Sequence, residues 1–123
     1  KLGGHTITGS IDRIDRDARG LHLIDYKSSK SPKELAKDKK DQLVLYHIAA
    51  EEVLKEPVAA LTFYFLEDQQ AKTFEATDKQ KDKLKEDIVS RIAQIQSSDF
   101  APTAKPEVCK NCDYKDICQY ARV

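Results

Sequence analysis

Two aspartates and a lysine near the N-terminus are the residues of this chain best suited to chemistry. Asp25 and Lys27 are two positions apart in GLHLIDYK. The alternation of apolar and polar residues there predicts a strand, so both side chains should leave the same face. Asp12 lies upstream in GSIDRID, which also has the pattern of a strand. If the strands form a hairpin, two carboxylates and one ammonium converge, and facing carboxylates repel unless a cation separates them.

This set of residues would suit divalent-metal chemistry on a phosphate. Oxygen ligands favour Mg²⁺ or Mn²⁺, which keep several waters and can also take a phosphate oxygen. The backbone carbonyl of Tyr26 could complete the ligand set. Lys27 would then orient or help deprotonate a water and stabilise negative charge at phosphorus. The alternative is that Asp25 and Lys27 form an ordinary solvated ion pair, which contributes little energy.

The register of the hairpin decides between these interpretations. A four-residue loop over 17–20, built on a type I turn, places Arg16 opposite Leu21 and therefore Asp12 opposite Asp25. The same register would place Ser10 opposite Lys27. A three-residue loop with a glycine bulge would shift the pairing by one residue and turn the first aspartate to the other face. The sequence leaves both registers open.

The elements that must position these residues follow the order β-β-α-β-β-α, with a cysteine-bearing tail. We expect the strands before and after the first helix to pair in parallel through a right-handed crossover. The fold class is therefore predicted to be α/β, a small mixed sheet flanked by helices. The expected elements are strands over 5–16 and 20–27, a helix opening at Ser31 or, past the polar KDKKD, near Asp41, strands over 58–67 and 72–77, and a long helix capped by Thr77 or Asp78.

The composition limits the possible partners. The 123 residues suffice for one domain with a modest core, and 21 basic residues balance 21 acidic ones. A nucleic-acid partner would therefore need a local basic patch or a metal, since the net charge offers no attraction. Lys30 and Lys33 directly follow the predicted active strand, either as a solvated face or as a flank that contacts DNA phosphates. No apolar run approaches the roughly 18 residues of a membrane span, and the lack of a signal peptide favours a cytoplasmic location.

Three motifs together resemble the nuclease domain of the PD-(D/E)xK superfamily, and most closely its RecB-like and AddB-like branch. They are GSIDRID with Asp12, LIDYKSSK with Asp25 and Lys27, and QLVLYHIAA with Gln42 and Tyr46. The resemblance implies a restriction-endonuclease-like core and metal-dependent cleavage of DNA in a helicase–nuclease system for repair or recombination. The helicase would be a domain of the same chain or a partner subunit. It also implies that the two aspartates hold Mg²⁺ or Mn²⁺, that the lysine acts on the water, and that Gln42 and Tyr46 line the site.

The three cysteines of the chain are clustered near its C-terminus, which favours a metal site over a disulfide framework. The resemblance implies that they are three ligands of a [4Fe–4S] cluster, which needs four sulfurs. The fourth cysteine would lie upstream, in a segment that this chain lacks. Zinc held by the cysteines and one histidine is the alternative. The residues concerned are Cys109, Cys112 and Cys118, with His5, His22 and His47 as the histidines.

The expected organisation is a nuclease core over 1–100 and a cysteine-containing tail over 101–123, packed on the same domain. The start without methionine and the odd cysteine count predict an N-terminally truncated fragment that is weak or inactive in isolation. Two other functions are open: a non-catalytic DNA-binding or structural module of a helicase–nuclease assembly, and a zinc-bearing interaction domain.

Overall fold

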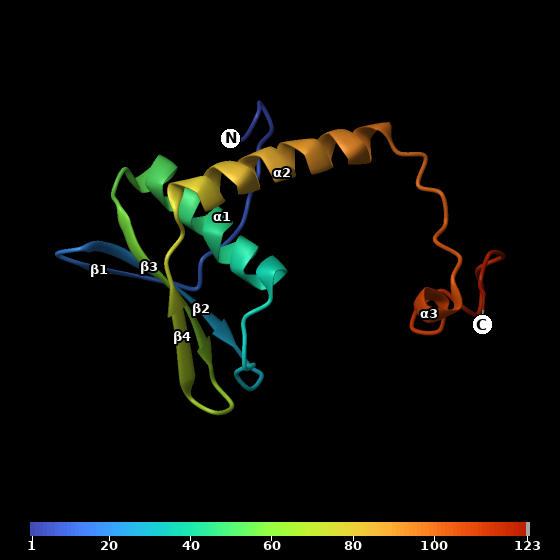
Figure 1. Cartoon of the computed structure of the whole chain (residues 1–123), viewed down its shortest axis with the longest axis horizontal. Coiled ribbons are helices and arrows are strands. Elements are labelled where there is room, and N and C mark those ends of the chain that lie inside the picture. The colour runs from blue at the N-terminus through green and yellow to red at the C-terminus, as the bar shows by residue number, and fades with distance from the viewer. Residues whose placement is uncertain (123) are drawn as a thin grey trace. The chain divides into compact units, whose positions relative to one another are not determined.

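A computed structural model describes residues 1–122 of the chain (Figure 1). These residues form two compact units, the first over Lys1–Arg91 and the second from Ile92 onward. Within the described residues, no helix combines the length and the apolar character that crossing a membrane requires. The elements are β1 (Arg13–Asp17), β2 (Gly20–Lys27), α1 (Lys37–Leu54), β3 (Val58–Phe65), β4 (Gln70–Phe74), α2 (Asp78–Ser97) and the short α3 (Pro106–Cys109).

The first unit is built on a four-stranded mixed sheet in the order β1-β2-β3-β4. β1 and β2 pair antiparallel, and so do β3 and β4, whereas β2 and β3 pair in parallel. The helix α1 makes the crossover between the two parallel strands, which is how the chain returns to the same end of the sheet. The predicted α/β class, the order of the elements and the parallel central pair are confirmed.

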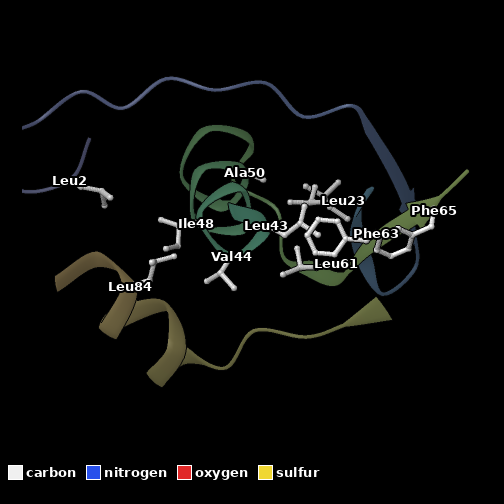
Figure 2. Close-up of a cluster of buried hydrophobic side chains, with 11 residues drawn as sticks. Leu2, Leu23, Leu43, Val44, Ile48, Ala50, Leu61, Phe63, Phe65 and Leu84 are labelled. Carbon is white, nitrogen blue, oxygen red and sulfur yellow. The ribbon is translucent and has the colours of Figure 1, made fainter. Parts of the chain in front are cut away.

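The core lies between α1 and one face of the sheet (Figure 2). Alternate residues of the two central strands point at the helix, so each strand contributes a row of apolar side chains. The row on β2 begins with Leu21 and Leu23 and ends in Asp25, which is buried too. The other buried side chains of the cluster come from β3, α1, α2 and the N-terminal segment, with Leu2 and Leu84 farthest from the strands (Figure 2): Leu2, Leu43, Val44, Ile48, Ala50, Leu61, Phe63, Phe65 and Leu84. The last residue of an apolar row is therefore a carboxylate.

The helix α1 begins between the two starts that the sequence suggests, after Ser31 and before Asp41. Its first residue is Lys37, and Ala36 at the N-cap provides no side-chain cap. Ser31, the expected cap, donates its hydroxyl instead to the carboxylate of Asp68, at 2.6 Å. The prediction that the helix opens at Ser31 is wrong, because the Ser31 side chain hydrogen-bonds Asp68, which is distant in the sequence, and does not cap the helix.

The N-terminal segment also departs from expectation, since β1 covers only Arg13–Asp17 and not residues 5–16. Residues 6–12 form no strand. Several of them line a groove together with side chains of α1, among them Tyr46. A Cβ on Gly9 would lie 3.1 Å from the ring of Tyr46, so the absence of a side chain permits this close approach. Packing on the helix has replaced pairing in the sheet.

The start of α2 agrees with its sequence signal. Thr77 accepts a hydrogen bond from the backbone N–H of Gln80 at 3.1 Å, and the Gln80 side chain accepts one from the backbone N–H of Thr77 at 2.9 Å. This reciprocal pair is a capping box, which satisfies two otherwise unpaired donors. Leu84 is the residue of this helix that is buried.

Gly20 opens β2 in a conformation that a larger residue cannot adopt, so we expect Gly20→Ala to destabilise the fold. Its φ is +133°, and an added Cβ would overlap the carbonyl oxygen of Pro57, which accepts the backbone N–H of Leu21 at 2.8 Å. We expect a loss of about 2–4 kcal/mol in the free energy of unfolding, measured with urea. Gly4→Ala is the control, because Gly4 also has a positive φ, +80°, but no atom within 4 Å of the added Cβ. Equal losses in the two variants would contradict the steric argument.

Candidate active site

The register of the β1–β2 hairpin brings Asp12 into line with Asp25. Arg16 pairs with Leu21, which is the register expected for the unbulged loop. The loop is shorter than predicted, because Asp17 and Gly20 also pair and leave a two-residue turn. The ladder ends one residue before Asp12. The bulged register, which would have turned this aspartate to the opposite face, is therefore excluded.

Asp12 is fixed by the backbone of the neighbouring strand. Its Oδ2 accepts the backbone N–H of Tyr26 at 2.9 Å. In an extended strand the N–H and C=O of one residue leave on the same side, so the Tyr26 carbonyl also points toward the edge where β1 has ended. Ser10 does not pair with Lys27, contrary to expectation, because the ladder has already stopped. A carboxylate and a backbone carbonyl thus share one side of β2.

Asp25 is a buried carboxylate with unused acceptor capacity. The residue is 7% exposed, and its Oδ2 lies 3.0 Å from Nζ of Lys27. That distance makes an ion pair, yet the angles exclude a hydrogen bond, and Oδ2 has no other partner among the described residues. A buried carboxylate oxygen without hydrogen bonds is costly. Such an oxygen is a suitable ligand for a cation.

Lys27 is held by contacts on several sides. Its ammonium lies over the ring of Phe63, 5.5 Å from the centroid. It also lies 3.5 Å from Oε1 of Gln42, a long contact. The amide of Gln42 donates in turn to the hydroxyl of Tyr46 at 3.2 Å. The predicted supporting pair on α1 therefore forms a chain that ends at the lysine, and the structure brings all five candidate side chains to one end of β2.

Phe63 also contributes to this site, although no motif in the sequence marks it as a site residue. It pairs with Asp25 in the parallel ladder and is fully buried beneath Lys27. A ring face attracts an ammonium, which adds to the fixation of the amine. Phe63 is one of the buried residues that alternate along β3. Its position beneath Lys27 can be recognised only once the parallel register with β2 is known.

The donor set fits a hard divalent cation. Asp12, Asp25 and the carbonyl of Tyr26 offer oxygen atoms only, which is the chemistry that Mg²⁺ and Mn²⁺ prefer. Within residues 1–122 no group of three or more histidine, cysteine, aspartate or glutamate side chains converges on a metal site. Mg²⁺ commonly uses one or two carboxylates and completes its shell with water and substrate, so two aspartates suffice.

The cysteines of the second unit are not assembled as a ligand set in the described part of the chain. All three are free, and they range from the buried Cys109 to the exposed Cys118. Two of the histidines considered for zinc make other contacts, His22 with Asp17 and His47 with Glu51. The present arrangement does not fit an iron–sulfur cluster or zinc, and no step of the chemistry below depends on either.

A mixed sheet flanked by helices, with two acids and a lysine at one end of a central strand, defines the restriction-endonuclease-like class of fold. The chain belongs to the PD-(D/E)XK nuclease superfamily, whose family model matches residues 1–119. Members of this superfamily typically use divalent metals. A comparison with curated proteins finds no match. The predicted superfamily is confirmed, whereas the RecB-like and AddB-like branch stays a prediction.

Proposed function

We propose that this chain is a Mg²⁺- or Mn²⁺-dependent deoxyribonuclease domain that hydrolyses phosphodiester bonds. The observation that carries the proposal is the placement of Asp12, Asp25 and Lys27 at one end of β2. The buried carboxylate there has an oxygen without a hydrogen-bond partner. Membership of a nuclease superfamily supports the same reaction class.

The two aspartates and the Tyr26 carbonyl would hold the metal. When bound, the ion supplies Lewis-acid polarisation of the phosphate and lowers the pKa of water. The protein's own contribution is to fix the ligands beforehand. The backbone N–H of Tyr26 holds the Asp12 side chain, and burial restricts that of Asp25. Ligands fixed in advance lose little entropy when the site is loaded.

Lys27 would act on the attacking water and on the phosphate. Its ammonium has three donors, and among the described residues 1–122 Asp25 is the only charged group that it contacts. It can therefore orient a water toward phosphorus and donate to a phosphate oxygen whose negative charge grows in the transition state. Gln42, held by Tyr46, would keep the amine from turning toward solvent.

Lys30 and Lys33 are proposed to contact DNA phosphates beside the scissile bond. Both are exposed, and neither takes part in an ion pair within residues 1–122. Binding through them would weaken as salt rises. A local contact of this kind is what a chain of zero net charge requires.

The sequence resemblance supports a narrower proposal. We infer a RecB-like or AddB-like nuclease that works with a helicase, in the same chain or as a partner subunit, in DNA repair or recombination in the cytoplasm. In a longer parent protein, Cys109, Cys112 and Cys118 would provide three ligands of a [4Fe–4S] cluster, together with a fourth cysteine from elsewhere.

The proposal is tested by incubating the chain with single- and double-stranded DNA and Mg²⁺ or Mn²⁺. We expect cleavage that disappears when a chelator removes the metal. Slow cleavage also supports the proposal, provided that it depends on the metal in this way. DNA binding without any cleavage would favour the alternative of a non-catalytic module. The absence of both cleavage and divalent-metal binding would contradict the proposed function.

A further inference from the structure

The segment between β2 and α1 directly follows Lys27 and carries Lys30 and Lys33. It comprises residues 28–36 and forms no helix or strand. A segment of this kind is ordinarily mobile, and ordering it on binding costs free energy. Two contacts from the β3–β4 hairpin restrain it here, so its position is set before any substrate arrives.

The stronger contact is made by Asp68, which lies in the turn between β3 and β4. Its carboxylate accepts the hydroxyl of Ser31 at 2.6 Å, and it accepts the backbone N–H of the same residue at 3.1 and 3.3 Å. The second contact runs from Nζ of Lys72 on β4 to the backbone carbonyl of Lys33, at 3.1 Å. The restraints therefore act on Ser31, which adjoins Lys30, and on the backbone of Lys33 itself.

The contact with Ser31 is made by an ionised carboxylate at neutral pH. The Ser31 hydroxyl lowers the pKa of Asp68 from its ordinary value of 3.8, against a smaller opposing effect of burial. A carboxyl whose pKa is lowered on folding stabilises the structure above its unfolded pKa, and that contribution is lost as the pH falls through the lowered value. The restraint is thus complete under the conditions in which nucleases work.

Glu67, the neighbour of Asp68 in the same turn, shows that the contact is specific. It is exposed and makes no side-chain hydrogen bond or ion pair within residues 1–122. An aspartate in a turn usually bonds its own backbone nearby. Besides local contacts with the backbone of Asp68 and Gln70, which also lower its pKa, the Asp68 carboxylate reaches a residue 37 positions away in the sequence.

We propose that Asp68 is a positioning residue for substrate binding. It holds the 28–36 segment so that Lys30 and Lys33 contact the DNA phosphates beside the scissile phosphodiester bond, which would lie next to Lys27. The inference rests on the proposed nuclease function and adds to it a residue that touches neither metal nor substrate. Its effect should therefore fall on DNA affinity and on KM, with little effect on kcat.

The test compares Asp68→Asn with Glu67→Gln in the whole chain. Both variants remove one negative charge from the same turn, but only the first weakens a contact, because asparagine keeps one acceptor oxygen and places an amide donor where the second carboxylate oxygen accepted from Ser31. Affinity for a labelled single-stranded oligonucleotide is measured by anisotropy in EDTA, where metal-dependent cleavage cannot occur. We expect Asp68→Asn to weaken binding about tenfold and to reduce the salt slope by about 1.4, the share of two phosphate contacts. Glu67→Gln should bind as tightly as the wild type, or slightly more tightly.

Two further measurements separate positioning from a purely structural role. In Asp68→Asn, KM should rise about tenfold while kcat stays within about twofold, and amide hydrogen exchange over 28–36 should become faster. Ser31→Ala, which removes only the hydroxyl donor, should give the same changes at smaller size and provides a milder variant if Asp68→Asn folds poorly.

The outcomes distinguish this inference from the proposed function. If the wild type cleaves DNA but Asp68→Asn matches Glu67→Gln in affinity and salt slope, the positioning role is overturned and the nuclease proposal stands. Faster exchange without loss of affinity would overturn it equally. If the wild type neither binds nor cleaves DNA, the proposed function fails, and the role of Asp68 fails with it.

Discussion

Replacement of Lys27 by methionine is expected to slow DNA cleavage by about 10²–10³-fold, the usual cost of losing one preorganised donor to a transition state. The side chain is 29% exposed and its end lies over Phe63, so methionine should fit in the same space. Because it leaves the buried Asp25 without its ion-pair partner, urea unfolding is used to verify that the variant is folded. The measurement is a single-turnover cleavage rate at saturating metal.

The control for this experiment is Lys79→Met on α2, which removes the same charge from an exposed position away from the site. We expect its rate to match that of the wild type, because overall charge is not what Lys27 contributes. A Lys27→Met protein that is folded and cleaves as fast as the wild type would refute the role assigned to the amine.

Replacement of Asp25 by asparagine is expected to abolish the stabilisation that Mn²⁺ gives to the folded protein. An ion that binds only the folded state at 100 times its dissociation constant stabilises it by about 2.7 kcal/mol. The asparagine removes the buried ligand charge, so this gain should vanish together with cleavage. The measurement is urea unfolding with and without Mn²⁺.

Asp15→Asn is the matched control, because Asp15 lies on β1 and pairs with Arg13 at 2.8 Å. It should keep the full gain from Mn²⁺. In the absence of metal, Asp25→Asn should change stability by no more than about 1 kcal/mol, since Lys27 reaches solvent and can stay hydrated. Equal stabilisation of Asp25→Asn and the wild type by Mn²⁺ would show that the ion binds elsewhere.

Local patterns in the sequence predicted the elements because those features depend on near neighbours, whereas the register of the first hairpin was left open between two alternatives. Alternation identified β2, an apolar run identified β3, and Thr77 marked the start of α2. The side-chain period of two fixes which residues share a face of a strand, so the spacing of Asp25 and Lys27 alone assigns both to one face.

The predictions for the start of α1 and for the extent of the first strand were wrong for the same physical reason. Both regions make contacts with residues that are distant in the sequence. Ser31 has every local mark of a helix cap, but its hydroxyl bonds Asp68, and α1 begins later as a result. The segment before Asp12 alternates like a strand, but Gly9 lets it pack against Tyr46. No local pattern records either partner.

The same limit applies to details of the candidate site. The sequence made the facing of Asp12 and Asp25 depend on the register, and the observed pairing, which ends at Arg13, would place them opposite each other if continued by one residue. It did not reveal that Asp12 bonds the backbone of Tyr26 or that Phe63 lies beneath Lys27. Both contacts depend on where neighbouring strands end and on the parallel pairing of β2 with β3.

If Asp12 and Asp25 together bind one divalent ion at the end of β2, removing either carboxylate should weaken its binding. Mn²⁺ is titrated into the wild type and into Asp12→Asn, and binding is measured by calorimetry. We expect one ion per wild-type chain and an affinity at least about tenfold weaker in the variant, since one of two charged ligands is gone. Equal affinity and stoichiometry in the two proteins would contradict it.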